Sequence, residues 1–153
     1  MSAKPPFGPP VADDESVYRV VLYEKQWAAA NDRPSSALFD DDIFSVEIAS
    51  RTTPESTASR KRSVLKIVEF NCGQARMLGF DTRDERDEIA PDNVAHAHVY
   101  SPSEGRKGKA RQLAIVCRTV EFDLEEAERL RVQIASQAGA EPGDRPPASQ
   151  VTP

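Results

Sequence analysis

The chain has 153 residues, a length typical of one domain, and its 39% hydrophobic and 29% charged residues are those of an ordinary globular protein. No apolar run approaches the roughly 20 residues that a membrane-spanning helix needs, and the first residues lack the hydrophobic centre of a secretion signal. A net charge of −5 argues against a protein that coats nucleic acid indiscriminately. We therefore expect a soluble cytoplasmic protein with neither a membrane nor a nucleic acid as its partner.

Proline marks both ends of the chain. Eight of the 12 prolines lie in residues 1–15 and 137–153, among glycine, serine, alanine and charged residues that have little to bury. Such segments cannot offset the entropy lost on ordering. We predict two disordered tails, 1–15 and 137–153, around a single folded domain that spans residues 16–136.

In the first half of this domain, the sequence predicts two strands, a loop and a helix. Residues 17–23 are rich in branched and aromatic side chains, which favours a strand. A loop is expected at 31–36, where Asn, Asp, Pro and Ser cluster. Residues 43–48 alternate apolar and polar side chains, which indicates a half-buried strand. Thr53 precedes a proline and an acid, a typical helix start, so we predict a polar, exposed helix over 54–62.

The second half begins with a strand over residues 64–70, followed by a short helix that Asn71 caps and Gly79 ends. The composition of residues 80–91 indicates a polar connection. Residues 94–100 are expected to form a further strand. Together with the elements that follow, this order predicts an α+β fold, a small mixed or antiparallel sheet with packed helices.

Two more helices complete the predicted domain. Residues 107–117 place apolar side chains at the period of an amphipathic helix. Asp123 is expected to cap a last helix, in which Glu125 and Arg129 would pair one turn apart. The predicted apolar stripe of this last helix is Leu124, Ala127, Leu130 and Ile134.

The only two histidines, His96 and His98, are the best candidates for chemistry. A strand sends alternate side chains to opposite faces, so these imidazoles and the ring of Tyr100 would share one face. One reading is a metal site completed by Glu47 or Glu104, similar in outline to the cupin pattern. The inventory holds no third histidine, so we predict neither a metal nor a cofactor.

Three other readings of this face stay open. His-Ala-His-Val resembles the histidine-triad nucleotide hydrolases, although Tyr100 stands where the third histidine should be. Arg19 and Ser45, on two early strands, faintly resemble the ADP-ribosyltransferases, which would imply an NAD-sized pocket, but the late Glu-x-Glu pair is replaced by His-x-His. The third reading is structural, a partly exposed sheet surface packed by a helix.

We also predict a polar cleft, because many polar residues interrupt otherwise apolar strands. Its catalytic candidates are His96, His98, Arg19 and Ser45, its ligand-binding candidates are Arg33, Ser35 and Ser36, and Tyr100 is a further ligand-binding candidate. A glycine-containing basic loop offers separate anion-binding candidates, namely Arg106, Lys107, Lys109 and Arg111. Solvation of a flexible charged loop explains this last segment more simply.

Four segments, 18–21, 33–39, 44–47 and 93–99, resemble landmarks of a family of short bacterial proteins without assigned activity. The resemblance spans most of the domain and implies no mechanism. We therefore expect a binding module, an accessory or regulatory component that acts with a protein partner. The alternative is a small enzyme or ligand-binding domain that uses the His-x-His cleft.

Overall fold

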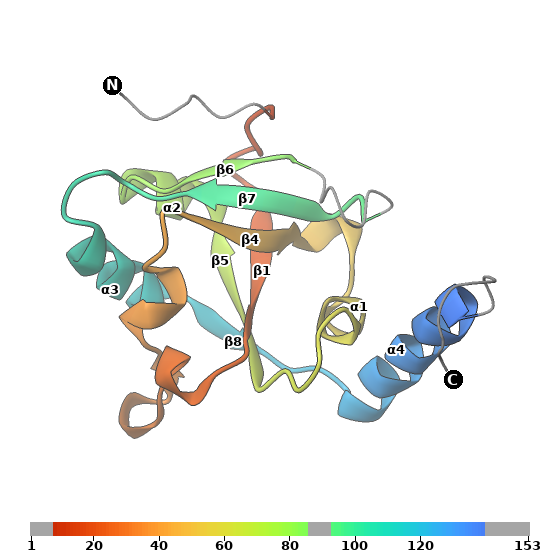
Figure 1. Ribbon diagram of the computed structural model, residues 1–153. Helices are drawn as coiled ribbons and strands as arrows, with labels where there is room; N and C mark the ends of the chain where they lie inside the picture. The colour runs from red at the N-terminus through yellow and green to blue at the C-terminus, as the bar shows by residue number, and fades with distance from the viewer. Residues whose placement is uncertain (1–7, 86–92, 140–153) are drawn as a thin grey trace.

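Six antiparallel strands form the central sheet of the protein in the computed structural model, which describes residues 8–85 and 93–139 (Figure 1). In sheet order they are β6 (Asp81–Arg83), β7 (His96–Tyr100), β4 (Ile43–Ile48), β1 (Ser16–Val21), β5 (Lys66–Asn71) and β8 (Arg118–Val120). A small second sheet pairs β2 (Trp27–Ala28) with β3 (Arg33–Pro34). The helices are α1 (Pro54–Ser59), α2 (Cys72–Met77), α3 (Arg106–Val116) and α4 (Leu124–Gly139), and η3 (Ser36–Phe39) is one of several short 3-10 helices. The predicted α+β class is confirmed.

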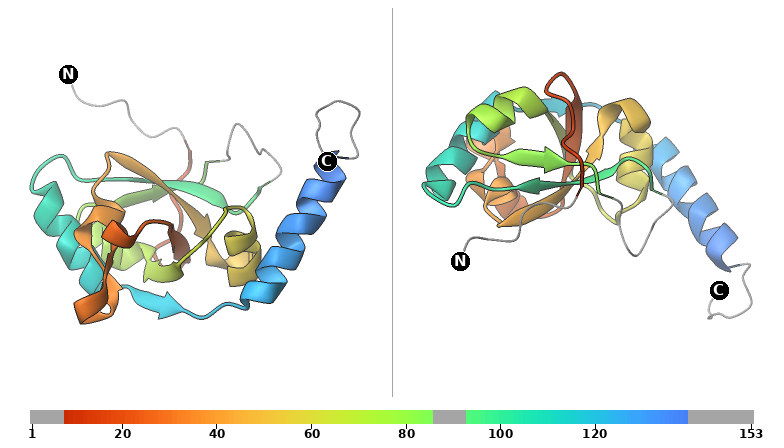
Figure 2. Two further views of the ribbon diagram at one scale, coloured as in Figure 1. Left: turned by 60° about the horizontal axis from the view of Figure 1, so that its bottom comes forward. Right: turned by 90° about the horizontal axis from the view of Figure 1, so that it is seen from above.

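The main hydrophobic core lies on one face of this sheet. Along β4, Phe44, Val46 and Ile48 are buried, as the alternation of residues 43–48 predicted. They pack with apolar side chains of β1, β5 and β7, and with α2, α3 and η3. A second, smaller cluster around Ala58, Ile67 and Ala127 lies on the other face, under α1 and α4. Figure 2 shows α2 and α3 on one side of the molecule and α1 and α4 on the other.

The sheet opens between its two central strands. β1 and β4 have six residues each, yet their register joins only Val17 to Ile48 and Tyr18 to Glu47. Beyond that point β4 runs across the molecule with β7, while β1 descends with β5 (Figure 1). Arg19 bridges the opening, since its Nη1 donates to the Ser45 carbonyl at 3.0 Å and its Nε to the Leu38 carbonyl at 3.1 Å. The guanidinium replaces sheet hydrogen bonds that diverging strands cannot make.

Local signals placed several elements correctly. Thr53 accepts a hydrogen bond from the Ser56 amide at 3.1 Å and Asn71 from the Gln74 amide at 3.0 Å, so both predicted caps start helices. Gly79 follows α2 with a φ of 96°, a conformation that favours glycine.

Other expectations were wrong. The predicted polar connection over 80–91 contains β6, whose Thr82 is buried, while residues 86–92 lie outside the described residues. The helix expected to be exposed, α1, buries Thr57, Ala58 and Ser59 because α4 and the sheet enclose it. In α4 the predicted stripe holds only in part: Ala127 is buried, whereas Leu124 and Ile134 are exposed. Arg129 pairs with Glu126, one position nearer than the predicted Glu125.

Part of the predicted N-terminal tail packs against the sheet. Val11 is buried in the core, and its amide donates to the Thr82 carbonyl at 3.0 Å. Nearby, Pro10 forms an isolated bridge with Arg83 of the edge strand. The segment 8–15 therefore covers β6, an edge that would otherwise expose unpaired backbone groups. The remaining parts of the predicted tails, 1–7 and 140–153, lie outside the described residues.

Among the helices of the described ranges, none combines the length and the apolar character that crossing a membrane requires.

Candidate functional site

The two histidines lie on the same face of β7, as the alternation of the strand predicted. Their rings are 4.7 Å apart between centroids and nearly perpendicular. The register places His96 opposite Glu47 and His98 opposite Ser45 on β4, so all four side chains project from the face that α1 and α4 partly cover.

Ser45 and His96 form a hydrogen-bonded pair. The Nε2 atom of His96 lies 3.2 Å from Ser45 Oγ, and its Nδ1 lies 2.7 Å from the backbone carbonyl oxygen of Glu85. A carbonyl only accepts, so Nδ1 carries a proton, and in the neutral imidazole the Nε2 lone pair accepts from the serine hydroxyl. His96 is 6% exposed, whereas Ser45 is open to solvent. A buried imidazole is thus held in the tautomer that can take a proton from an accessible hydroxyl.

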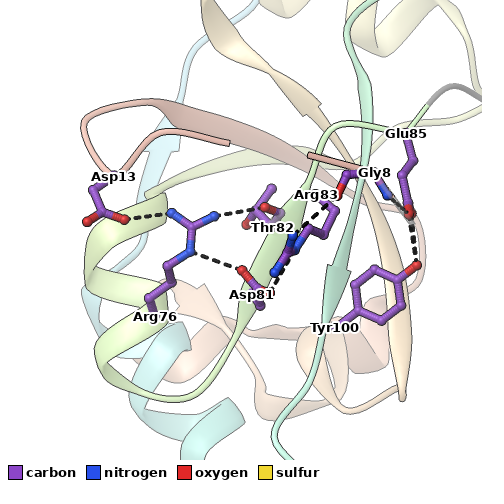
Figure 3. A network of polar contacts seen from close by, with 8 residues as sticks. All are labelled: Gly8, Asp13, Arg76, Asp81, Thr82, Arg83, Glu85 and Tyr100. Carbon is purple, nitrogen blue, oxygen red and sulfur yellow. Dashed lines mark hydrogen bonds and ion pairs between the residues drawn. The ribbon is translucent and has the colours of Figure 1, made fainter. Parts of the chain in front are cut away.

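His98 and Tyr100 have a different partner. Both contact the carboxylate of Glu85, with His98 Nδ1 and the Tyr100 hydroxyl each 2.9 Å from Oε1. The amide of Gly8 donates to the other carboxylate oxygen at 2.8 Å (Figure 3). Burial and the Glu85 contact raise the pKa of Tyr100 to about 12, so its hydroxyl stays protonated as a donor. These groups tie β7 to the chain after β6 and do not line the cavity described below.

Arg76 and Arg83 hold the edge of the sheet from which Glu85 extends. Arg76 donates to Asp13 at 2.6 Å, to Asp81 at 3.0 Å and to the Thr82 carbonyl at 2.8 Å (Figure 3). Arg83 Nε donates to the same Asp81 carboxylate at 2.9 Å. The network joins the N-terminal segment, α2 and β6, and thereby fixes the strand whose continuation presents a carbonyl to His96.

Glu47 is a buried carboxylate with three partners. It is 8% exposed, and it accepts from Thr57 Oγ1 at 2.8 Å and from Asn93 Nδ2 at 2.9 Å. Arg60 Nε lies 3.3 Å from the same carboxylate. Since the charge is paired and hydrogen-bonded, burial is tolerated, and the carboxylate joins α1 to the sheet.

A cavity of about 720 Å³ lies where β1 and β4 diverge, beneath α1 and α4. Ser45, Glu47 and His96 line its sheet side, and Tyr18 and Val20 of β1 continue that wall. The lining has five basic residues against one acidic residue, Glu47, and the basic residues are Arg19, Arg60, Lys61, Arg62 and Arg131. This positive lining contrasts with the net charge of −5 of the whole chain. Arg60 is paired with Glu47, and Arg131 with Glu128 at 2.8 Å, so Arg19, Lys61 and Arg62 supply the larger part of the positive charge with which the described walls favour an anion.

The residues of the predicted cleft do not all lie in one place in the structure. Arg19, Ser45 and His96 reach this cavity, but Arg33, Ser35 and Ser36 do not line it. The hydroxyl of Ser35 instead donates to the Lys25 carbonyl at 2.6 Å, which stabilises the loop beside β3. The expectation that all the polar candidates share one cleft is therefore wrong.

The basic segment expected to be a flexible loop is helical: Arg106, Lys107, Lys109 and Arg111 all lie in the first half of α3, away from the cavity lining. Arg106 forms ion pairs with Asp40 and Asp42, so its charge is already balanced within the chain. Lys107 and Arg111 are exposed, and Lys109 is partly buried. Their role as anion ligands stays a prediction.

Over residues 8–85 and 93–139, His96 and His98 belong to no group of three or more His, Cys, Asp or Glu side chains that could hold a metal ion.

Several site residues were missed in the sequence. Arg60 and Thr57 lie in the segment 54–62 that the sequence predicts to be an exposed helix, and nothing in the pattern of the last helix singles out Arg131. The signals that pointed to this wall are the alternation in 43–48, which puts Ser45 and Glu47 on one face, and the polar residues Arg19 and His96 in otherwise apolar strands. The approach of α1 and α4 to that face depends on tertiary packing, for which a single sequence has no local signal.

Comparisons with models of protein families, with curated proteins and with solved structures find no match, so the function is inferred from the geometry of the site itself.

Proposed function

We propose that the protein is a ligand-binding domain that takes up a small anionic molecule with an apolar part. The observation that carries the proposal is the cavity of about 720 Å³, whose described lining has five basic residues and one acidic residue in an acidic chain. Pockets of roughly 300–1,000 Å³ are typical of small-molecule sites. The one acidic residue, Glu47, is already paired with Arg60, so it repels an incoming anion less than a free carboxylate would.

The cavity also favours a ligand with apolar surface. Val20 of β1, Val46 of β4 and the nearby Leu22 line it on the sheet side, and Ile134 and Ala135 of α4 line it on the helix side. Burying an apolar group against such side chains contributes about 25 cal/mol per Å². The charged head of the ligand would lie near the arginines and its apolar body against β1 and α4.

The test uses 8-anilinonaphthalene-1-sulfonate, a fluorescent dye that carries both a sulfonate and an apolar ring system. We expect Arg62→Glu and Arg131→Glu each to weaken its binding about tenfold, because a charge reversal near the sulfonate replaces attraction with repulsion, worth a kcal/mol or more at about 4 Å. Fluorescence titration of the folded full chain at low salt measures the Kd.

Two controls separate this cavity from the rest of the surface. Lys107→Glu makes the same charge reversal in the first turn of α3 and should change the Kd by less than about twofold. Ile115→Glu places a charge in an exposed apolar groove of about 380 Å³ between α2 and α3, the other surface to which the dye could bind. The proposal fails if the control variants weaken binding as much as the cavity variants.

The other function expected from the sequence, an accessory role beside a larger protein in the cytoplasm, stays a prediction. Reconstitution of a stoichiometric complex from two purified proteins is its test.

A further inference from the structure

We infer that Ser45 is a nucleophile for acyl transfer, with His96 as its proton acceptor, and that the substrate is an ester with an anionic group. This inference rests on the proposed function, because it places the reaction in the same cavity. Nucleophilic serines need an adjacent base and a third group that orients the base. All three parts come from separate strands or strand ends here: Ser45 from β4, His96 from β7, and the Glu85 carbonyl from the segment after β6.

The geometry gives the proton a defined path. Ser45 Oγ lies 3.2 Å from His96 Nε2, a distance typical of such pairs before the substrate binds. The 2.7 Å contact between Nδ1 and the Glu85 carbonyl keeps Nε2 unprotonated in the neutral ring and stabilises the imidazolium that forms later. The positioning group is a carbonyl instead of a carboxylate.

Other serine, histidine and carboxylate side chains near Ser45 have partners of their own within the chain. Ser59 also lines the cavity, but its hydroxyl donates to the Ser56 carbonyl at 2.6 Å. His98 contacts the Glu85 carboxylate, and Glu47 is held by α1 and Asn93. Within the described lining, Ser45 is thus the serine whose hydroxyl meets an imidazole.

The reaction proceeds in two balanced steps. Ser45 Oγ forms a bond to the acyl carbon, its proton passes to His96 Nε2, and the ester C–O bond then breaks as the leaving alcohol takes that proton. Water next attacks the acyl-serine, gives a proton to Nε2, and releases the acid while Oγ regains the proton. The cations of the lining stabilise the negative charge that develops on the carbonyl oxygen.

The test is covalent labelling of the full chain with an alkyl fluorophosphonate. The Oγ–P bond forms, the P–F bond breaks, and fluoride leaves with the hydroxyl proton. We expect one label, which peptide mass spectrometry places on Ser45. The labelling rate should fall to background in Ser45→Ala and about a hundredfold in His96→Asn, since a general base contributes at least about that factor.

Matched variants make the result specific. Ser103→Ala and Ser50→Ala should label within about twofold of the unmodified chain, because both serines are exposed and lie outside the cavity lining. Ser45→Ala truncates an exposed side chain and should fold normally, which thermal melting checks. An unlabelled wild-type chain, a label on another residue, or an equal loss in Ser103→Ala would overturn the inference.

The substrate class is tested separately, by measuring the hydrolysis of two esters. Hydrolysis of 4-nitrophenyl hemisuccinate should exceed that of the neutral 4-nitrophenyl acetate in kcat/KM, and Arg62→Glu should reduce that preference. Equal rates for both esters would overturn the anionic part of the inference. If the dye of the previous section binds but Ser45 is not labelled, only the nucleophile is wrong; if the dye does not bind in the cavity, the proposed function itself fails.

Discussion

Glu47→Ala is expected to lower the free energy of unfolding by about 2 kcal/mol or more, because two buried donors, Thr57 Oγ1 and Asn93 Nδ2, each lose their acceptor at a cost of about 1 to 3 kcal/mol. The substitution leaves the Thr57 hydroxyl, the Asn93 amide and the Arg60 guanidinium without their common acceptor. A buried donor that has lost its acceptor is shielded from water and gains no hydrogen bond in exchange, so the folded state is destabilised. Chemical denaturation with urea, followed by circular dichroism, measures the change.

Glu126→Ala provides the matched control. Its carboxylate also pairs with an arginine, Arg129 at 2.6 Å, but on the exposed surface of α4. Exposed pairs contribute about 0 to 1 kcal/mol, so this variant should unfold close to the wild-type midpoint. A loss in Glu47→Ala no larger than in the control would show that the carboxylate does not hold α1 on the sheet.

Phe39→Ala is expected to cost about 3 to 5 kcal/mol, as for other large-to-small changes of a buried aromatic residue. Phe39 is fully buried on η3, with its ring centroid 5.6 Å from that of Phe44 and 5.7 Å from that of Phe70. Removing the ring leaves a cavity between η3 and the two strands, and it also removes favourable aromatic contacts. The same denaturation experiment measures it.

Met77→Ala is the comparison for Phe39→Ala. The Met77 side chain is 85% exposed, so its truncation should change stability by less than about 0.5 kcal/mol. Similar losses in the two variants would mean that η3 does not close the main core.

Local sequence signals predicted the elements whose causes are local. The alternation in residues 43–48 predicted β4 and its two faces, and the hydroxyl of Thr53 and the amide of Asn71 predicted the starts of α1 and α2. Each depends on the pleat of one strand or on the unpaired amides of one helix turn, which the sequence specifies directly.

Features that arise from pairing between distant segments were missed. β6 has only three residues, in an acidic and basic stretch that resembles a loop, and it is a strand because β7 pairs with it and residues 8–11 cover its edge. Likewise, α1 has few large apolar side chains, yet its small residues let it lie close to the sheet and to α4. Tertiary contacts override local propensity in both cases.

The candidate site, like the fold, could be predicted only where its causes are local. The strand period placed His96 with His98 and Ser45 with Glu47, but it could not show that the two strands are neighbours in register. It also gave no indication that His98 and Tyr100 are held by Glu85, or that Arg60 and Arg131 reach the cavity from α1 and α4. Arg33, Ser35 and Ser36 were grouped with the site by residue type alone, and type does not specify position.

The most direct measurement of the binding site is an amide ¹H–¹⁵N spectrum of the full chain during titration with 8-anilinonaphthalene-1-sulfonate. If the cavity between β1, β4, α1 and α4 holds the anion, the amides of Val20, Glu47 and Ile134 should shift in a saturable way, while those of Met77 and Lys107 stay in place. Shifts centred on Met77 or Lys107, with Val20, Glu47 and Ile134 unchanged, would contradict the assignment of this cavity as the ligand site.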